Sequence, residues 1–175
     1  MSQLPFLHQI DNLFTVEECK ELIERANKEG WKDVDRDIAT YRRVTIVDKR
    51  LSASLFKKIR GLLGSHYQGK RITGLNELFR FSKYEPGEKF EMHKDGFNVN
   101  RAGDRSIMTL NIFLNDDFDG GETDFYLGDR TTLRFSCKPK PGRGALFDSQ
   151  QYHCGNEVRN GYKYLIRTDV MATIF

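Results

Sequence analysis

Two residues near the middle of the sequence and one far downstream carry side chains that bind transition metals: His93 and Asp95, which flank a lysine, and His153. In an extended strand, residues two apart project on the same side about 7 Å apart, so His93 and Asp95 can hold one ion together. Two imidazoles and one carboxylate on one side of a metal leave other coordination positions open, as in non-haem Fe(II) sites. Open positions indicate chemistry and not only a structural role.

The triplet by itself is a weak signal. An H-x-D sequence also arises by chance, and a lone histidine is more often a hydrogen-bonded structural residue. The metal interpretation therefore depends on what surrounds these residues in the sequence.

A cationic candidate lies on the last predicted strand, residues 162–174. Alternation places Lys163, Leu165, Arg167 and Asp169 on one face. A lysine directed into the interior is costly to bury alone, so an inward Lys163 requires an anionic partner such as a bound carboxylate. On an edge strand the same face would meet solvent instead. The pattern leaves both interpretations open.

The predicted strand 106–114 also has two distinct faces. Its apolar face predicts a core contact and consists of Met108, Leu110, Ile112 and Leu114. Thr109 and Asn111 interrupt the other face. Those two polar residues could line a pocket or face water, and periodicity does not decide between the two.

Short strands separated by Gly, Pro, Asn and Asp follow from residue 77 onward. This texture is typical of a sandwich or barrel. The predicted strands are 77–84, 89–95, 106–114, 130–137, 143–148 and 162–174. We expect an α+β, mainly β, fold: a double-stranded β-helix, or jelly roll, with N-terminal helices packed against one sheet.

Two helices are predicted ahead of these strands. Residues 15–29 begin with Thr15 as N-cap and Glu18 three positions later, which is a capping box, and Gly30 follows as a stop. Residues 51–63 repeat leucine and isoleucine at helical spacing. Residues 38–47 are predicted to be extended, and Arg42 and Arg43 within them are either solvated or directed toward a substrate.

Length and composition favour one soluble domain. The 175 residues are expected to form a single domain, 1–175, with 1–76 as a helical support region and 77–175 as the β body. The net charge is only +3 and the basic residues are dispersed, which does not suggest nucleic acid as a partner. Three irregularly spaced cysteines indicate free thiols, and we find no signal peptide or membrane-length apolar run, so the expected location is cytoplasmic. The oligomeric state cannot be read from the sequence.

Several motifs occur together in a recognisable order. They are Arg80-Phe81-Ser82-Lys83-Tyr84-Glu85-Pro86-Gly87, Phe90, His93-Lys94-Asp95-Gly96, Thr109, Leu114-Asn115, Gly120-Gly121-Glu122-Thr123, Gly142 to Asp148, His153 and Gly161-Tyr162-Lys163-Tyr164. This series resembles the Fe(II)/2-oxoglutarate dioxygenases of the prolyl 4-hydroxylase type. The resemblance covers about residues 80–175, and ordered motifs are far more specific than the triplet.

The resemblance implies a role for seven residues. His93, Asp95 and His153 would be the iron ligands and catalytic centre. Lys163 would form a salt bridge to the C5 carboxylate of 2-oxoglutarate, with Tyr84 and Thr109 beside that co-substrate. Arg167, in an Arg-Thr-Asp-Val-Met run common among relatives, is a second cationic candidate for it.

The implied activity is hydroxylation of an unactivated C–H bond, with Fe(II), 2-oxoglutarate and O2 as cofactor and co-substrates and ascorbate as a candidate reductant. A prolyl residue of a protein or peptide is the first expected substrate, and a free amino acid or small metabolite is the alternative. A second alternative is a cupin-like module that binds a metal or ligand without turnover. The spacing from His153 to Lys163 argues against the nucleic-acid demethylase branch.

Overall fold

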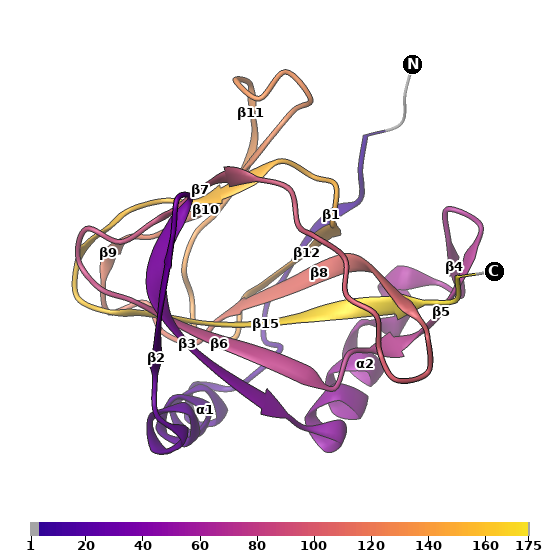
Figure 1. Cartoon of the computed structure of the whole chain (residues 1–175), viewed down its shortest axis with the longest axis horizontal. Coiled ribbons are helices and arrows are strands. Elements are labelled where there is room, and N and C mark those ends of the chain that lie inside the picture. Colours follow the sequence, from indigo (N-terminus) through magenta and orange to yellow (C-terminus); the bar gives the residue numbers. More distant parts are fainter. Residues whose placement is uncertain (1–3, 175) are drawn as a thin grey trace.

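The computed structural model describes residues 4–174 and is mainly antiparallel β-sheet (Figure 1). Two helices and fifteen strands are present in this part of the chain. In order they are β1 Leu7–Ile10, α1 Val16–Glu29, β2 Lys32–Arg36, β3 Ala39–Val47, α2 Lys49–Leu63, β4 His66–Tyr67, β5 Lys70–Leu75, β6 Leu78–Tyr84, β7 Phe90–His93, β8 Arg105–Phe113, β9 Asp119–Gly120, β10 Thr123–Tyr126, β11 Leu133–Cys137, β12 Gly144–Asp148, β13 His153–Gly155, β14 Val158–Asn160 and β15 Lys163–Ala172.

The main sheet folds back on itself into two facing layers. Its hydrogen-bonded order is β1-β12-β8-β15-β6-β3-β7-β13-β10-β11, and the short pair β14-β9 forms a separate sheet. In Figure 1, β8, β15, β6 and β3 form the layer above the helices, and β7 and β10 lie on the side of that layer away from the helices. This nearly closed antiparallel arrangement confirms the predicted mainly β jelly roll with helices against one sheet.

The two helices cover the outer face of the larger layer. Thr15 caps α1 through the backbone N–H of Glu18, and the Glu18 carboxylate accepts from the Thr15 N–H, so the predicted capping box is present. The helices bury apolar side chains against Val44 and Ile166 of the sheet, among them Cys19 and Leu55. This packing holds the larger layer in place, and its opposite face remains to line the cavity.

Strands β15 and β8 lie in the centre of the sheet and are not edges. β15 pairs with β8 on one side and with β6 and β5 on the other. The open question about the face with Lys163 is therefore decided, because that face points into the cavity and Lys163 is 2 % exposed. On β8, Met108 and Leu110 join the helix-side core, and Thr109 lies on the cavity side, where it contacts Asp95.

The first 76 residues do more than supply helices. Strand β1 pairs with β12, β3 pairs with β6, and β5 pairs with β15, so this segment completes the main sheet. The strand patterns also left out β10 and β13, which are four and three residues long. Segments this short show no clear alternation of apolar and polar residues. They are strands because they form hydrogen bonds with neighbouring strands.

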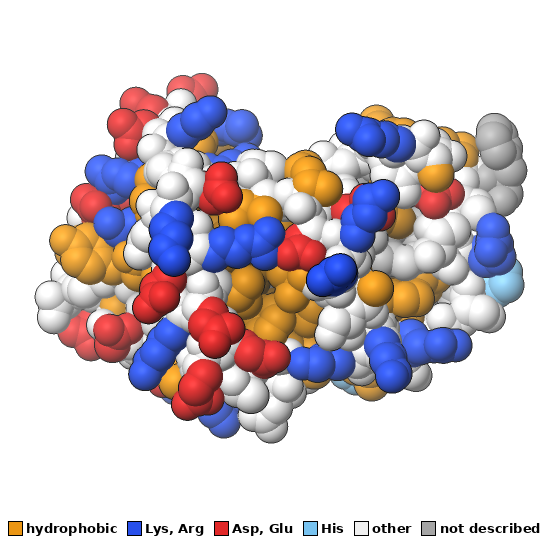
Figure 2. Space-filling model, turned by 90° about the horizontal axis from the view of Figure 1, so that it is seen from below, with side chains coloured by type: hydrophobic (Ala, Val, Ile, Leu, Met, Phe, Trp, Pro, Cys, Tyr) orange, Lys and Arg blue, Asp and Glu red, His pale blue; other side chains and the backbone are white. Residues whose placement is uncertain are grey.

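Side chains of both charge signs are mixed on the helical face of the molecule. Figure 2 shows acidic and basic side chains interspersed over the face that carries α1 and α2. No helix within residues 4–174 is long and apolar enough to cross a membrane.

Candidate metal centre and co-substrate pocket

The three predicted metal ligands come together at the facing ends of two paired strands. His93 is the last residue of β7 and His153 is the first of β13, and the strand register places them opposite each other. Asp95 lies just beyond β7, whereas the sequence predicted strand through that residue. Its backbone N–H donates to the carbonyl of Ser149 at 2.9 Å, which fixes the loop after β7.

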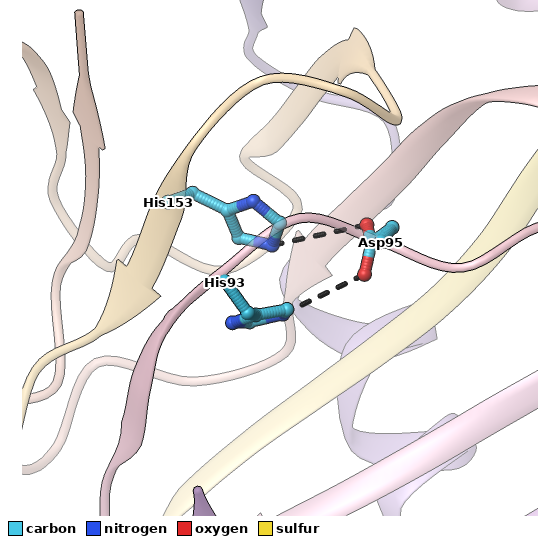
Figure 3. A group of neighbouring side chains, drawn as sticks. All are labelled: His93, Asp95 and His153. Carbon is cyan, nitrogen blue, oxygen red and sulfur yellow. Dashed lines mark ion pairs between the residues drawn. The ribbon is translucent and has the colours of Figure 1, made fainter. Parts of the chain in front are cut away.

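The donor atoms of the three residues converge on one point. Each of the three residues offers one ligand atom, and these atoms lie within 4.8 Å of one another. Within residues 4–174, no other group of three or more His, Cys, Asp or Glu side chains comes this close together. The Nε2 atom of His93 lies 3.6 Å from Oδ1 of Asp95, and that of His153 lies 3.8 Å from Oδ2 (Figure 3). Two imidazole nitrogens and a carboxylate fit the donor preferences of Fe(II).

Backbone carbonyls fix the orientation of both imidazole rings. Nδ1 of His93 lies 2.7 Å from the carbonyl oxygen of Glu91, and Nδ1 of His153 lies 2.9 Å from that of Gln151. Because a carbonyl only accepts, each Nδ1 carries the hydrogen. The lone pair is then on Nε2, which faces the other ligands, as metal binding requires.

The Asp95 carboxylate is held in its charged form. It is 5 % exposed, accepts from the Thr109 hydroxyl at 2.6 Å and accepts from Nη1 of Arg167 at 2.8 Å. Burial alone would raise its pKa, but the Arg167 charge, the hydrogen bonds and the adjacent histidines hold the pKa well below its usual range. Asp95 is therefore an anionic donor at neutral pH.

His153 is neutral at the same pH. Burial lowers the pKa of its imidazole to about 4, although the nearby Asp95 charge acts in the opposite direction. Phe125 and Phe147 pack on the ring, with centroid distances of 5.9 and 4.6 Å. A neutral imidazole can donate its lone pair without first losing a proton.

The three candidate metal ligands open onto a pocket between the two layers. The pocket contains about 500 Å³ of space free of protein atoms, part of it open to solvent. Its lining includes three of the four residues predicted to hold the co-substrate, Lys163, Tyr84 and Arg167. The fourth, Thr109, lies behind Asp95 and binds its carboxylate.

Lys163 is a buried cation surrounded by aromatic rings. Its Nζ lies 5.0 Å from the ring centroid of Tyr84 and 5.4 Å from that of Phe113. Burial lowers the pKa of the ammonium to about 8 from 10.5, and the charge of Glu122 offsets only part of this effect. A cation in these surroundings provides a binding site for an anion.

Arg167 is placed differently from Lys163. It joins Asp95 to Asp169, whose Oδ1 lies 3.2 Å from Nη2 of Arg167, and Arg80 binds the other oxygen of Asp169 at 3.0 Å. The two arginines therefore share a carboxylate that is 1 % exposed. The role of Arg167 toward the co-substrate stays a prediction.

The sequence assigns no role to several other pocket residues and leaves Arg43 open between solvent and a substrate. Tyr41 and Arg43 on β3, Arg80 on β6 and Phe90 on β7 all line the cavity. Phe90 stacks on His93 with a centroid distance of 4.0 Å. Alternation along β3, β6 and β7 was the signal that could have identified these residues, but only the strand pairing shows which face is inward.

A jelly roll with two imidazoles, a carboxylate and a buried lysine in one pocket has the features of a 2-oxoglutarate-dependent metalloenzyme. Residues 79–168, just over half of the chain, match the family model described as the 2OG-Fe(II) oxygenase superfamily. The chain belongs to this superfamily, as the motif resemblance predicted. Fe(II) and 2-oxoglutarate, which give the superfamily its name, are thus the cofactor and co-substrate to consider here.

Relatives named as prolyl hydroxylases are similar to this chain. Prolyl 4-hydroxylase 1 of Arabidopsis thaliana is 33 % identical over 109 residues, which cover 50 % of this chain and 38 % of that relative. The matched part therefore spans well under half of the relative.

Solved structures agree on the fold. A viral collagen prolyl hydroxylase of Paramecium bursaria chlorella virus-1, in a 2OG complex, has a TM-score of 0.72 at 22 % identity, covering 96 % of this chain and 97 % of that chain. A prolyl hydroxylase of Trichoplax adhaerens, in complex with a hypoxia inducible factor peptide fragment, has a TM-score of 0.74 at 17 % identity, covering 94 % and 83 %. At these identities the similarity concerns the fold.

Proposed function

We propose that this protein is an Fe(II)- and 2-oxoglutarate-dependent dioxygenase that hydroxylates a prolyl residue of a protein or peptide. The observation that carries the proposal is one pocket that holds His93, Asp95 and His153 together with the buried ammonium of Lys163. Membership of the superfamily supports the reaction class. The relatives named as prolyl hydroxylases support the substrate class.

The three ligands would hold Fe(II), and Lys163 would hold the far carboxylate of 2-oxoglutarate. Bound Fe(II), with 2-oxoglutarate and O2, supplies the oxidising power to hydroxylate a C–H bond while 2-oxoglutarate is converted to succinate and CO2. A cupin-like binding module would need no buried lysine beside its metal, so Lys163 favours an enzyme over that alternative.

The chain itself contributes orientation and a controlled environment. Thr109 and Arg167 hold the Asp95 carboxylate at both oxygens, and the carbonyls of Glu91 and Gln151 fix the two imidazoles. Ligands that are already oriented lose little freedom when a metal binds. The aromatic rings around Lys163 limit water near the ammonium, which strengthens its attraction for a carboxylate.

The loop between β7 and β8 is our candidate for the substrate side of the pocket. Asn98 in this loop donates to Asp169 at 2.9 Å, so the loop is anchored to the carboxylate that Arg80 and Arg167 share. Phe97, the residue before Asn98, is 59 % exposed, and its ring stacks on the Arg105 guanidinium. An exposed aromatic ring at this place is suited to contact a peptide.

The test is succinate formation by the purified protein with Fe(II), 2-oxoglutarate and O2. We expect proline-containing peptides to stimulate succinate release and to gain one oxygen atom by mass spectrometry. His93→Ala should abolish both signals. Stimulation by free amino acids but not by peptides would replace the prolyl proposal with the small-substrate alternative, and no succinate under any condition would contradict the enzyme proposal.

A further inference from the structure

Within residues 4–174, Arg43 is a cation of the pocket that has no anionic partner. It projects from β3 into the cavity that His93 also lines. Its Nε is buried and has no hydrogen-bond partner within residues 4–174. Its guanidinium lies 5.1 Å from the ring centroid of Tyr41, and an Nη of Arg43 contacts the Tyr41 hydroxyl. A tyrosine does not neutralise the charge.

The next residue along the strand provides a contrast. Arg42 points to the opposite face of β3, where three carboxylates lie within ion-pair distance: Asp33 at 3.3 Å, Glu85 at 3.0 Å and Glu88 at 3.6 Å. The Arg42–Glu85 contact lacks hydrogen-bond alignment, so it is an ion pair only. The charge of Arg42 is compensated by the chain, and that of Arg43 is not.

The charges inside the pocket do not balance without a ligand. Four cationic side chains line it: Arg43, Arg80, Lys163 and Arg167. The buried carboxylates Asp95 and Asp169 pair with Arg80 and Arg167. In the proposed binding mode 2-oxoglutarate places one carboxylate on Lys163 and the other on the metal, so the co-substrate leaves Arg43 without a counter-ion.

Two tyrosine rings lie between Lys163 and Arg43. The ring of Tyr84 stacks on that of Tyr41 with a centroid distance of 5.1 Å, the Lys163 ammonium lies over Tyr84, and the Arg43 guanidinium lies over Tyr41. The two cations also come from strands on opposite sides of β6, because Arg43 pairs with Ser82 and Lys163 with Tyr84. Strands flanking a common neighbour are about 10 Å apart, and the two stacked rings lie between the cations, so we assign Lys163 and Arg43 to separate anions.

The burial of the Arg43 charge adds to the case for an anionic ligand. Burial lowers the pKa of the Arg43 guanidinium. Tyr41 and Tyr84 act in the opposite direction, and the charges of Arg80 and Arg36 act in the same direction as burial. An arginine remains protonated in proteins, so this is a cost that an anionic ligand would relieve. The planar guanidinium can also bind a carboxylate through two parallel hydrogen bonds.

We propose that Arg43 binds a carboxylate of the substrate, so that the protein acts on an acidic substrate. The inference rests on the proposed function, and it adds a charge requirement to it. The carboxylate could come from an Asp or Glu side chain near the hydroxylated proline or from the free carboxylate of a small amino acid. Both sources carry the same chemistry, and the experiment below separates them.

The experiment measures equilibrium binding to the full chain loaded with Mn(II) and 2-oxoglutarate in the absence of O2, so that no turnover occurs. The probes are matched pairs read by calorimetry. The first series consists of proline peptides that carry either Asp or Asn at each position around the proline. The second series consists of two small-molecule pairs: N-acetylproline and its amide, and glutamate and glutamine. We expect the acidic member of at least one pair to bind about tenfold or more tightly.

Variants assign the preference to one side chain. Arg43→Gln should remove the discrimination between acid and amide, whereas Arg42→Gln, on the other face of the same strand, should keep it. Arg43→Glu should reverse it and favour peptides with lysine in place of Asp. Thermal melting of each variant checks that the fold is intact, and reversal of specificity by Arg43→Glu cannot arise from misfolding.

Several results would overturn the inference. Equal binding of acid and amide in every pair, or no binding of any acidic probe, would exclude the anion site. A preference that survives in Arg43→Gln would assign it to another cation, and loss of 2-oxoglutarate affinity in that variant would place Arg43 in the co-substrate site. If acids bind through Arg43 but no probe is oxidised under turnover conditions, the anion site stands and the proposed hydroxylase fails.

Discussion

Arg167 and Asp95 form an ion pair 2.8 Å long in the wall of the pocket, with the Asp95 carboxylate turned toward both histidines. The guanidinium thus stands beside the carboxylate that would bind the metal. In the metal-free protein it is the main counter-charge of Asp95, and it orients the carboxylate before any ion arrives. This relationship leads to the first prediction.

Arg167→Met should destabilise the metal-free protein by about 3–5 kcal/mol, because it leaves Asp95 as a buried charge without its partner. A bound divalent ion would replace the missing cation, so the loss should be smaller in the presence of Mn(II). Denaturant unfolding with and without Mn(II) measures both values. Arg42→Met, which removes a partly exposed arginine, is the control and should cost less than about 1 kcal/mol. An equal loss of stability with and without metal would contradict the prediction.

Lys163→Met should abolish tight binding of 2-oxoglutarate but increase the stability of the ligand-free protein. The folded-state pKa of about 8 lies below the ordinary 10.5, so the charged ammonium destabilises the fold below pH 8 by an amount on the order of 3 kcal/mol. That cost decreases as the pH rises from about 8 to about 10.5. Unfolding experiments on the two proteins at pH 7 and pH 10 should therefore show a difference that narrows at the higher pH. A less stable Lys163→Met protein at pH 7 would show that packing dominates.

The affinity for 2-oxoglutarate should depend on pH through the same group. Only the ammonium form attracts a carboxylate, so affinity should be constant below pH 8 and decrease above it, by up to about tenfold per pH unit. Titrations of the Mn(II)-loaded protein between pH 7 and pH 9.5 measure the profile. Lys163→Arg keeps its charge over this range and should give a flat profile even if its affinity is lower. If the affinity of the wild-type protein for 2-oxoglutarate did not decrease above pH 8, Lys163 would not be the residue that binds the co-substrate.

Gly121→Ala should weaken 2-oxoglutarate binding through Lys163. Gly121 has φ +67°, and a methyl group there would lie 2.7 Å from the Phe118 ring and 3.0 Å from Cδ of Lys163. The lysine must then move, in addition to the backbone strain. Gly128→Ala is the matched control, since a methyl group at Gly128 meets nothing within 4 Å and its φ is not in the left-handed region. Binding affinity and melting temperature are the readouts, and equal affinities in the two variants would contradict the prediction.

The convergence of the three candidate metal ligands was predictable because their signal is local. His93 and Asp95 are two residues apart, and the remote His153 is recognisable from the ordered motifs around it. The capping box at Thr15 and the alternation of β8 and β15 are also properties of neighbouring residues, and the structure follows them. Closely spaced side chains, helix caps and strand periodicity all depend on residues that are near one another in the sequence. They can therefore be predicted without knowing which distant residues are in contact.

The tertiary structure decided which charged faces are buried and which cations share a partner. Lys163 is inward only because β15 lies between β8 and β6, and Arg43 differs from Arg42 only because β3 pairs with β6 in one register. The joint pairing of Arg80 and Arg167 with Asp169 likewise brings together residues far apart in the chain. The sequence by itself determined the candidate metal ligands, the helix starts and the alternation of the strands. Pairing register and burial determined the charge balance of the pocket. A charged side chain is buried, or meets an oppositely charged partner, only when strands distant in sequence come together.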